Sequence, residues 1–152
     1  MTNYTDVISL ATAKLYLKIG SGQTETDNEI TAMINSALSY IEKRTNHIFK
    51  TRDKVYYKDC ALVQQVKVYD YPIQNVDDLD IVYRQNYAIV PTVNNMVTLT
   101  IGYEDVDDIP PELIDNGLAI INYWFYNTET KGSVNTIPDF INVNLDVNRR
   151  FI

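Results

Sequence analysis

Residues 26–46, TDNEITAMINSALSYIEKRTN, decide the fold class because they carry the most regular hydrophobic pattern in the chain. Thr26 and Glu29 have the spacing of a capping box at the start of a helix, and Asn46 can end that helix in the left-handed conformation. The apolar residues between them recur at i, i+3, i+4, i+7, i+8 and i+11: Ile30, Met33, Ile34, Ala37, Leu38 and Ile41. This spacing predicts a long helix over residues 27–46 that buries one face.

Two further helices are expected, one on each side of this segment in the sequence. Residues 9–18, SLATAKLYLK, predict a short helix with Ser9 as its N-cap. Residues 111–127 predict a third helix, because Pro111 suits a first turn, where its missing N–H would be unpaired in any case. The apolar residues of this third helix lie on one broad face: Leu113, Ile114, Gly117, Leu118, Ile121, Trp124 and Phe125.

Residues 48–102 show a different pattern, with an apolar residue at every second position. Val66 and Val68 flank Lys67, and threonines separate Val97, Leu99 and Ile101. Such alternation predicts strands with one buried face, so we expect an antiparallel sheet of about three to five strands. The predicted fold class is therefore α+β: a helical bundle with an inserted small antiparallel β-sheet, forming one domain over residues 1–127.

The last residues of the chain, 128–152, are predicted to form an extended C-terminal arm. Their apolar residues are thinly spaced, and the asparagines between them favour turns over regular structure. We expect the arm to gain order only on a partner protein or on a neighbouring subunit. Phe140, Leu145 and Phe151 are its candidate anchors, and Arg149 and Arg150 are candidates for bidentate contacts with partner carboxylates. The rival interpretation is that this segment folds back as a fourth helix on its own domain.

The composition argues against several classes of function. The chain has 152 residues and a net charge of −7, and an acidic surface repels the phosphates of nucleic acids. Apolar runs are far shorter than the roughly 20 residues of a membrane span. The N-terminal residues MTNYTDVISL lack the basic and apolar regions of a signal peptide, so we expect neither secretion nor a membrane partner.

No motif in the sequence predicts catalysis or a cofactor. His47 is the only histidine and Cys60 the only cysteine, and neither lies in a recognisable catalytic pattern. The segment with Glu104, Asp105, Asp107 and Asp108 is strongly acidic but lacks the spacing of a calcium loop. We therefore expect no metal site there. These acids are interpreted as a solvated surface or as the lining of a DNA channel.

The order of the elements and several short motifs resemble the head–tail connector (adaptor) proteins of tailed bacteriophages. The resemblance extends over nearly the whole chain, and its motifs are individually weak. The residues that carry it are Leu10, Lys14, Leu17, Asp27, Ile30, Ile34, Ala37, Ile41, Glu42, Thr45, Asn46, Tyr71-Pro72-Ile73, Gly102-Tyr103, Ile109-Pro110, Leu113, Ala119, Tyr126, Pro138 and Arg149-Arg150. Two positions depart from the family pattern: Asn46 replaces the usual glycine, and Thr12 replaces the usual acidic residue.

The resemblance implies a structural virion protein without catalytic activity. Such a protein would assemble in the host cytoplasm as a dodecameric ring at the head–tail junction of the virion. The ring would contact the portal protein on one side and the next tail or stopper protein on the other, and would extend the DNA channel without binding DNA specifically. The alternative is a tail or baseplate accessory module that binds a protein partner.

Overall fold

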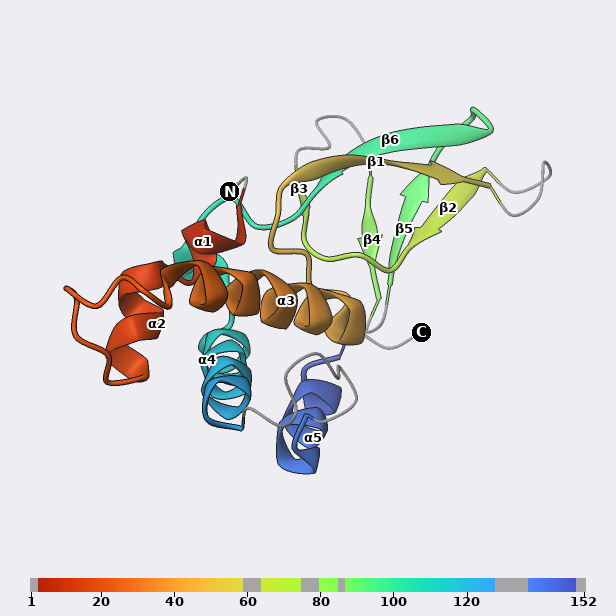
Figure 1. The fold of residues 1–152 in the computed structure, drawn as a ribbon. Coiled ribbons are helices and arrows are strands. Elements are labelled where there is room, and N and C mark those ends of the chain that lie inside the picture. The colour runs from red at the N-terminus through yellow and green to blue at the C-terminus, as the bar shows by residue number, and fades with distance from the viewer. Residues whose placement is uncertain (1–2, 59–63, 75–79, 85–86, 128–136, 150–152) are drawn as a thin grey trace.

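The computed structural model describes residues 3–58, 64–74, 80–84, 87–127 and 137–149. In these residues the chain forms five α-helices and six strands, which confirms the predicted α+β class. Figure 1 shows that the chain divides into a helical part and a β part, which meet near the end of the longest helix. The residue Cys60 lies outside the described residues.

Helix α3, which spans Asp27–Thr45, is the centre of the helical part. It packs against the four other helices: α1 (Tyr4–Val7), α2 (Leu10–Tyr16), α4 (Pro111–Tyr126) and α5 (Asp139–Val147). All six apolar residues of its predicted face are buried. Gly117 allows α4 to pack closely on the side chain of Ile8, because a Cβ at position 117 would lie 2.9 Å from Cδ1 of Ile8. The three helices predicted from the sequence are therefore confirmed.

The predicted helix ends are only partly correct. The Ser9 hydroxyl accepts a hydrogen bond from the Thr12 amide at 3.0 Å, and Asn46 has the left-handed conformation with φ of 61°. The Thr26 side chain, however, makes no capping hydrogen bond. Its backbone angles, φ −101° and ψ 2°, differ from the extended conformation of an N-cap residue, so the predicted capping box is wrong.

The β part consists of two small antiparallel sheets, whereas the sequence predicted one. Strands β1 (Arg52–Tyr57), β6 (Met96–Ile101) and β3 (Ile73–Gln74) form one sheet in that order. Strands β2 (Gln65–Val68), β5 (Ala88–Pro91) and β4 (Val82–Tyr83) form the other. The two sheets share a core separate from that of the helices: Ile48, Val66, Val68, Val90, Leu99 and Ile101. Strands of two to six residues bury their apolar faces against each other more completely as two layers than as one open sheet.

The two parts meet where the chain leaves α3. The Ile48 amide donates to the Tyr71 carbonyl at 2.7 Å, and the Tyr103 amide donates to the Ile48 carbonyl at 3.1 Å. Gly102 makes this crossing possible: its φ is +109°, and a Cβ would lie 2.7 Å from the Lys50 carbonyl oxygen. We refer to residues 46–50, 71–72 and 102–103 as the interlayer junction.

A buried carboxylate, that of Glu42, holds the interlayer junction to the helices. Its Oε1 accepts hydrogen bonds from the amides of Phe49, at 2.6 Å, and Lys50, at 3.2 Å. Its Oε2 accepts one from the Tyr4 hydroxyl at 2.9 Å and contacts the Arg52 guanidinium at 3.4 Å. Burial, followed by the charge and hydrogen bond of Glu42, raises the pKa of Tyr4 above its ordinary value. One side chain of α3 therefore joins α1, the junction and β1.

The prediction of an extended C-terminal arm is wrong for the described part of that segment. Residues 139–147 form helix α5, which packs on α3 and α4, as the rival interpretation expected. Ile137, Ile141 and Leu145 belong to the helical core. Ile141 and Leu145 lie four residues apart on one face of α5, and Ile137 lies just before the helix. There α3 and α4 supply the apolar surface that the segment lacks by itself.

We predict that Glu42→Ala destabilises the protein by about 3 kcal/mol or more, because buried donors lose their acceptor. Urea unfolding followed by circular dichroism measures the difference. Glu25→Ala, which removes an exposed carboxylate, is the matched control and should stay within about 0.5 kcal/mol of the wild type. Equal stability of the two variants would contradict the role given to Glu42.

A second prediction concerns α5. Leu145→Ala should lower the free energy of unfolding by about 2–5 kcal/mol, because it opens a cavity in the helical core. Val147→Ala removes an exposed side chain of the same helix and should change that free energy by less than about 0.5 kcal/mol. If Leu145→Ala were as stable as Val147→Ala, α5 would not contribute to the core.

Candidate interaction surfaces

Lys14 and Asp27, two residues of the resemblance, maintain the fold at the other end of α3. The Lys14 ammonium is buried and donates to Asp27 Oδ1 at 2.7 Å and to the Gln23 carbonyl at 2.5 Å. A buried ammonium needs such partners, since burial without them would be costly. The pair fixes the loop between α2 and α3, so we assign it a structural role.

The four predicted acidic residues lie together at the surface before α4. Glu104, Asp105, Asp107 and Asp108 are all exposed, and the last two belong to the short 3₁₀ helix η1 (Val106–Asp108). The Asp105 carboxylate accepts a hydrogen bond from the Asp107 amide at 3.3 Å, which orders the turn. Within the described residues, no three metal-ligating side chains come together as a cation site would require.

The predicted C-terminal anchors have different positions. Phe140 is 64% exposed and is available to a partner, whereas Leu145 is 0% exposed and belongs to the helical core. Leu145 is therefore wrong as an anchor, because it lies on the face of α5 that packs on the other helices. Arg149 is half-buried beyond the end of α5. Arg150 and Phe151 lie outside the described residues.

Helix α5 also has an apolar outer face that the sequence analysis missed. Phe140, Val143 and Val147, which we call the α5 stripe, are 64%, 61% and 78% exposed. A shallow groove adjoins the stripe at Val147, and α4 contributes Glu112 and Asp115 to its lining. The spacing of three and four residues could have revealed the stripe, but only the packing of α5 shows which of its two apolar faces points outward.

A second apolar surface lies on the β part. The register pairs Tyr57 with Met96 and Val55 with Thr98, so these side chains share one face of the β1–β6 pair. All four are exposed, and we call this surface the β1–β6 outer face. The opposite face of the same strands contributes to the core between the sheets.

Basic residues of β1 make contacts within the protein. Asp70 Oδ2 accepts hydrogen bonds from the Lys54 ammonium at 2.6 Å and from the Tyr56 hydroxyl at 2.5 Å. Burial and the bond to Asp70 raise the pKa of Tyr56 well above its ordinary value. These contacts connect β1 to the end of β2, which favours a structural role over a DNA-binding one.

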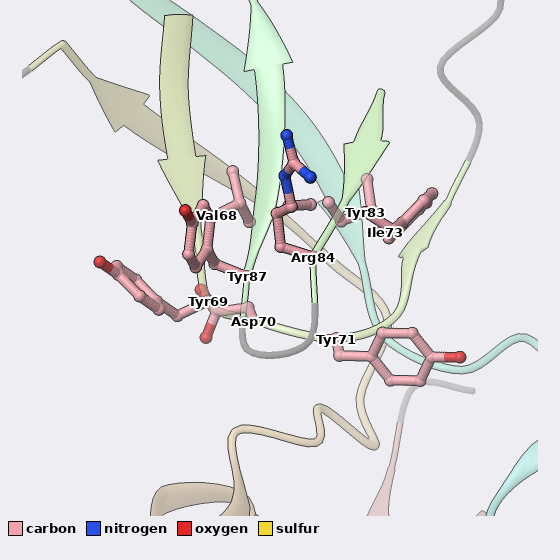
Figure 2. A pocket seen from close by; sticks show the side chains of 9 residues that line it. Val68, Tyr69, Asp70, Tyr71, Ile73, Tyr83, Arg84 and Tyr87 are labelled. Atoms are coloured by element: carbon pink, nitrogen blue, oxygen red, sulfur yellow. The ribbon is translucent and has the colours of Figure 1, made fainter. Parts of the chain in front are cut away.

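The most enclosed pocket that we describe is too small for a substrate. Figure 2 shows its lining between the ends of β2 and β5 and the residues of β3 and β4, with Arg84 near the middle. Its free volume is about 10 Å³, which is close to the space that one water molecule needs. Tyr69 and Tyr71 point away from it to opposite sides in this view.

His47 lies in the interlayer junction among aromatic rings. It is buried, and its Nδ1 is 2.6 Å from the Tyr103 hydroxyl oxygen. The Tyr103 ring stacks on the imidazole, and the Tyr71 ring contacts it edge-on. This arrangement gives the histidine a packing role at the end of α3.

Helices of the described residues are all too short or too polar to cross a membrane.

The fold is similar to that of chains from a gene transfer agent particle. A chain from the neck of an empty gene transfer agent particle, determined with C6 symmetry, aligns with a TM-score of 0.73 and 11% identity. The alignment covers 100% of this chain and 93% of that one. The two chains share one fold. A chain from the virion of the native gene transfer agent particle gives a TM-score of 0.71 at 12% identity, with 100% and 93% coverage. No protein-family model matches the sequence, and no curated protein sequence matches it.

We predict that the acidic segment does not bind divalent cations tightly. Calorimetric titration with calcium, magnesium or manganese should reveal no site tighter than about millimolar, the weak end of oxygen-ligand loops. Asp107→Asn serves as the comparison. A stoichiometric micromolar isotherm that disappears in this variant would contradict the prediction.

Proposed function

We propose that this protein is a structural, non-enzymatic component of the neck of a tailed bacteriophage or a related particle. The observation that carries the proposal is the similarity of fold over the whole chain to a neck chain, with a TM-score of 0.73. Similarity confined to one part would be weaker support, because small helical or β units recur in many unrelated proteins. Coverage of 100% includes both the helical part and the β part.

The proposed position is between the portal and the tail, as a ring adaptor. The resemblance to head–tail connectors supports a twelve-membered ring that contacts the portal and the next tail or stopper protein. The C6 symmetry used for the gene transfer agent neck is compatible with such a ring, because twelve-fold symmetry contains six-fold symmetry. Heterologous contacts repeated by rotation are the physical means of closing it.

In this proposal the acidic segment faces the DNA channel. Glu104, Asp105, Asp107 and Asp108 are exposed, and carboxylates on a channel wall would repel the phosphates of passing DNA. DNA would then move through the ring without adhering to it. The exposed Phe140 and the terminal residues Arg149, Arg150 and Phe151 remain the proposed contacts with the portal or a neighbouring subunit.

Co-expression with the portal protein encoded by the same genome tests the proposal. We expect the two proteins to co-purify and the chain to add a ring to the portal in negative-stain micrographs. Antibody labelling of intact particles should mark the head–tail junction. The major capsid protein from the same genome is the control bait and should not retain the chain.

Two results would overturn the proposal. One is a chain that does not bind the portal protein and is absent from purified particles. The other is labelling at the distal end of the tail, which would favour the alternative, a baseplate accessory module.

A further inference from the structure

Helix α5, which carries the α5 stripe, and strands β1 and β6, which carry the β1–β6 outer face, lie at opposite ends of the molecule. In Figure 1, α5 lies beneath α3 at the bottom of the helical part, and β1 and β6 form the top of the β part. Each surface exposes large apolar side chains, such as Phe140 and Val147 on one and Tyr57 and Met96 on the other. Two unlike apolar surfaces at opposite ends are what a head-to-tail contact between identical copies requires.

The surroundings of the two surfaces differ in charge. The groove beside the α5 stripe is lined by the carboxylates Glu112 and Asp115 together with Asn116, Asn144, Val147 and Asn148. The β1–β6 outer face ends at Lys58, whose ammonium lies 3.1 Å from the carbonyl oxygen of the highly exposed Val93. One surface is therefore apolar with an acidic wall. The other is apolar with Lys58 at one end and, at the other end, Asp53, whose carboxylate accepts a hydrogen bond from the Thr100 hydroxyl.

This difference favours the pairing of unlike surfaces over the pairing of like ones. Two α5 stripes facing each other would bring the acidic walls of both copies together, and like charges at an interface are unfavourable. The same α5 stripe against the β1–β6 outer face would bring carboxylates near an ammonium group. The apolar side chains of both surfaces would be removed from water in the same contact.

We infer that the α5 stripe and its groove on one copy receive the β1–β6 outer face of the next copy, with Lys58 close to Glu112 and Asp115. This inference rests on the proposed ring and identifies the surfaces that would build it. Because the contact is heterologous, its repetition by rotation closes into a ring when the angle between copies allows it. Every copy then uses both surfaces.

Cysteine cross-linking tests the contact directly. In a Cys60→Ser background, Val143→Cys and Met96→Cys place one thiol on each surface of the full chain. Mild oxidation of the double variant, both alone at high concentration and on the portal, should give a ladder of dimers, trimers and larger species. Each single variant should remain monomeric on a non-reducing gel, because its thiols do not face each other.

Charge exchange provides the second measurement. In the double-cysteine chain, Lys58→Glu or Asp115→Lys should each reduce the yield of ladder several-fold, and the two together should restore it. Leu15→Lys changes an exposed apolar residue of α2 and is the control that should leave the yield unchanged. Circular dichroism of each variant verifies that the fold is retained.

The outcomes separate this inference from the proposed function. The contact is overturned if the double variant gives no ladder in either preparation, or if Val143→Cys alone forms dimers. It is also overturned if the exchanged charges fail to restore the ladder. A chain that binds the portal but gives no ladder contradicts only this inference. A chain that gives the ladder of cross-linked species but does not bind the portal contradicts only the proposed position.

Discussion

The fold depends on placing one carboxylate, that of Glu42, away from water. An isolated buried charge would cost many kcal/mol, so the side chain is tolerable only while several donors surround it. Those donors come from α1, from the residues after α3 and from the start of β1. The requirement therefore constrains how the β part leaves the helical part, because the amides of Phe49 and Lys50 and the guanidinium of Arg52 must all reach the carboxylate.

Residues that are far apart in the sequence meet at this point. The interlayer junction joins Asn46, in its left-handed conformation, to Tyr71 and Tyr103 through hydrogen bonds and ring contacts. Several motifs that carry the resemblance to connector proteins belong to this junction. Others, such as Lys14 of α2 and Asp27 of α3, hold the loop before α3. These motif residues therefore stabilise the fold. The exposed apolar residues proposed as contacts, such as Phe140 and Tyr57, are not among the motif residues.

Periodicity predicted the two longest helices, α3 and α4, because each has enough turns for its apolar face to stand out, and the N-cap Ser9 helped to predict the short helix α2. Periodicity did not predict α5, although Ile137, Ile141 and Leu145 are spaced by four residues, because the asparagines between them have low helix propensity. Helix α1, with only four residues, is too short for any periodic signal. The division of the strands into two sheets depends on which faces meet in space, and alternation within a strand carries no information about that.

The same reasoning explains which parts of the candidate site could be predicted. The exposure of the acidic segment followed from its charge, because unpaired carboxylates are rarely buried. The division of α5 into a buried Leu145 and an exposed Phe140 could not follow from composition, since both residues are apolar. What decides this division is the rotation of α5 about its own axis relative to α3 and α4. That rotation is set by tertiary packing.

The two ends of α3 are held by polar contacts that differ in their access to ions. The Lys14–Asp27 pair is mostly buried, whereas the bidentate pair between Arg44 and Asp146, which joins α3 to α5, is more than a third exposed on both sides. Dissolved salt screens exposed charges far more than buried ones. Ionic strength therefore acts on the attachment of α5 while leaving the loop before α3 nearly untouched. In the proposed setting, the salt concentration around the particle would therefore change how firmly this one helix is held.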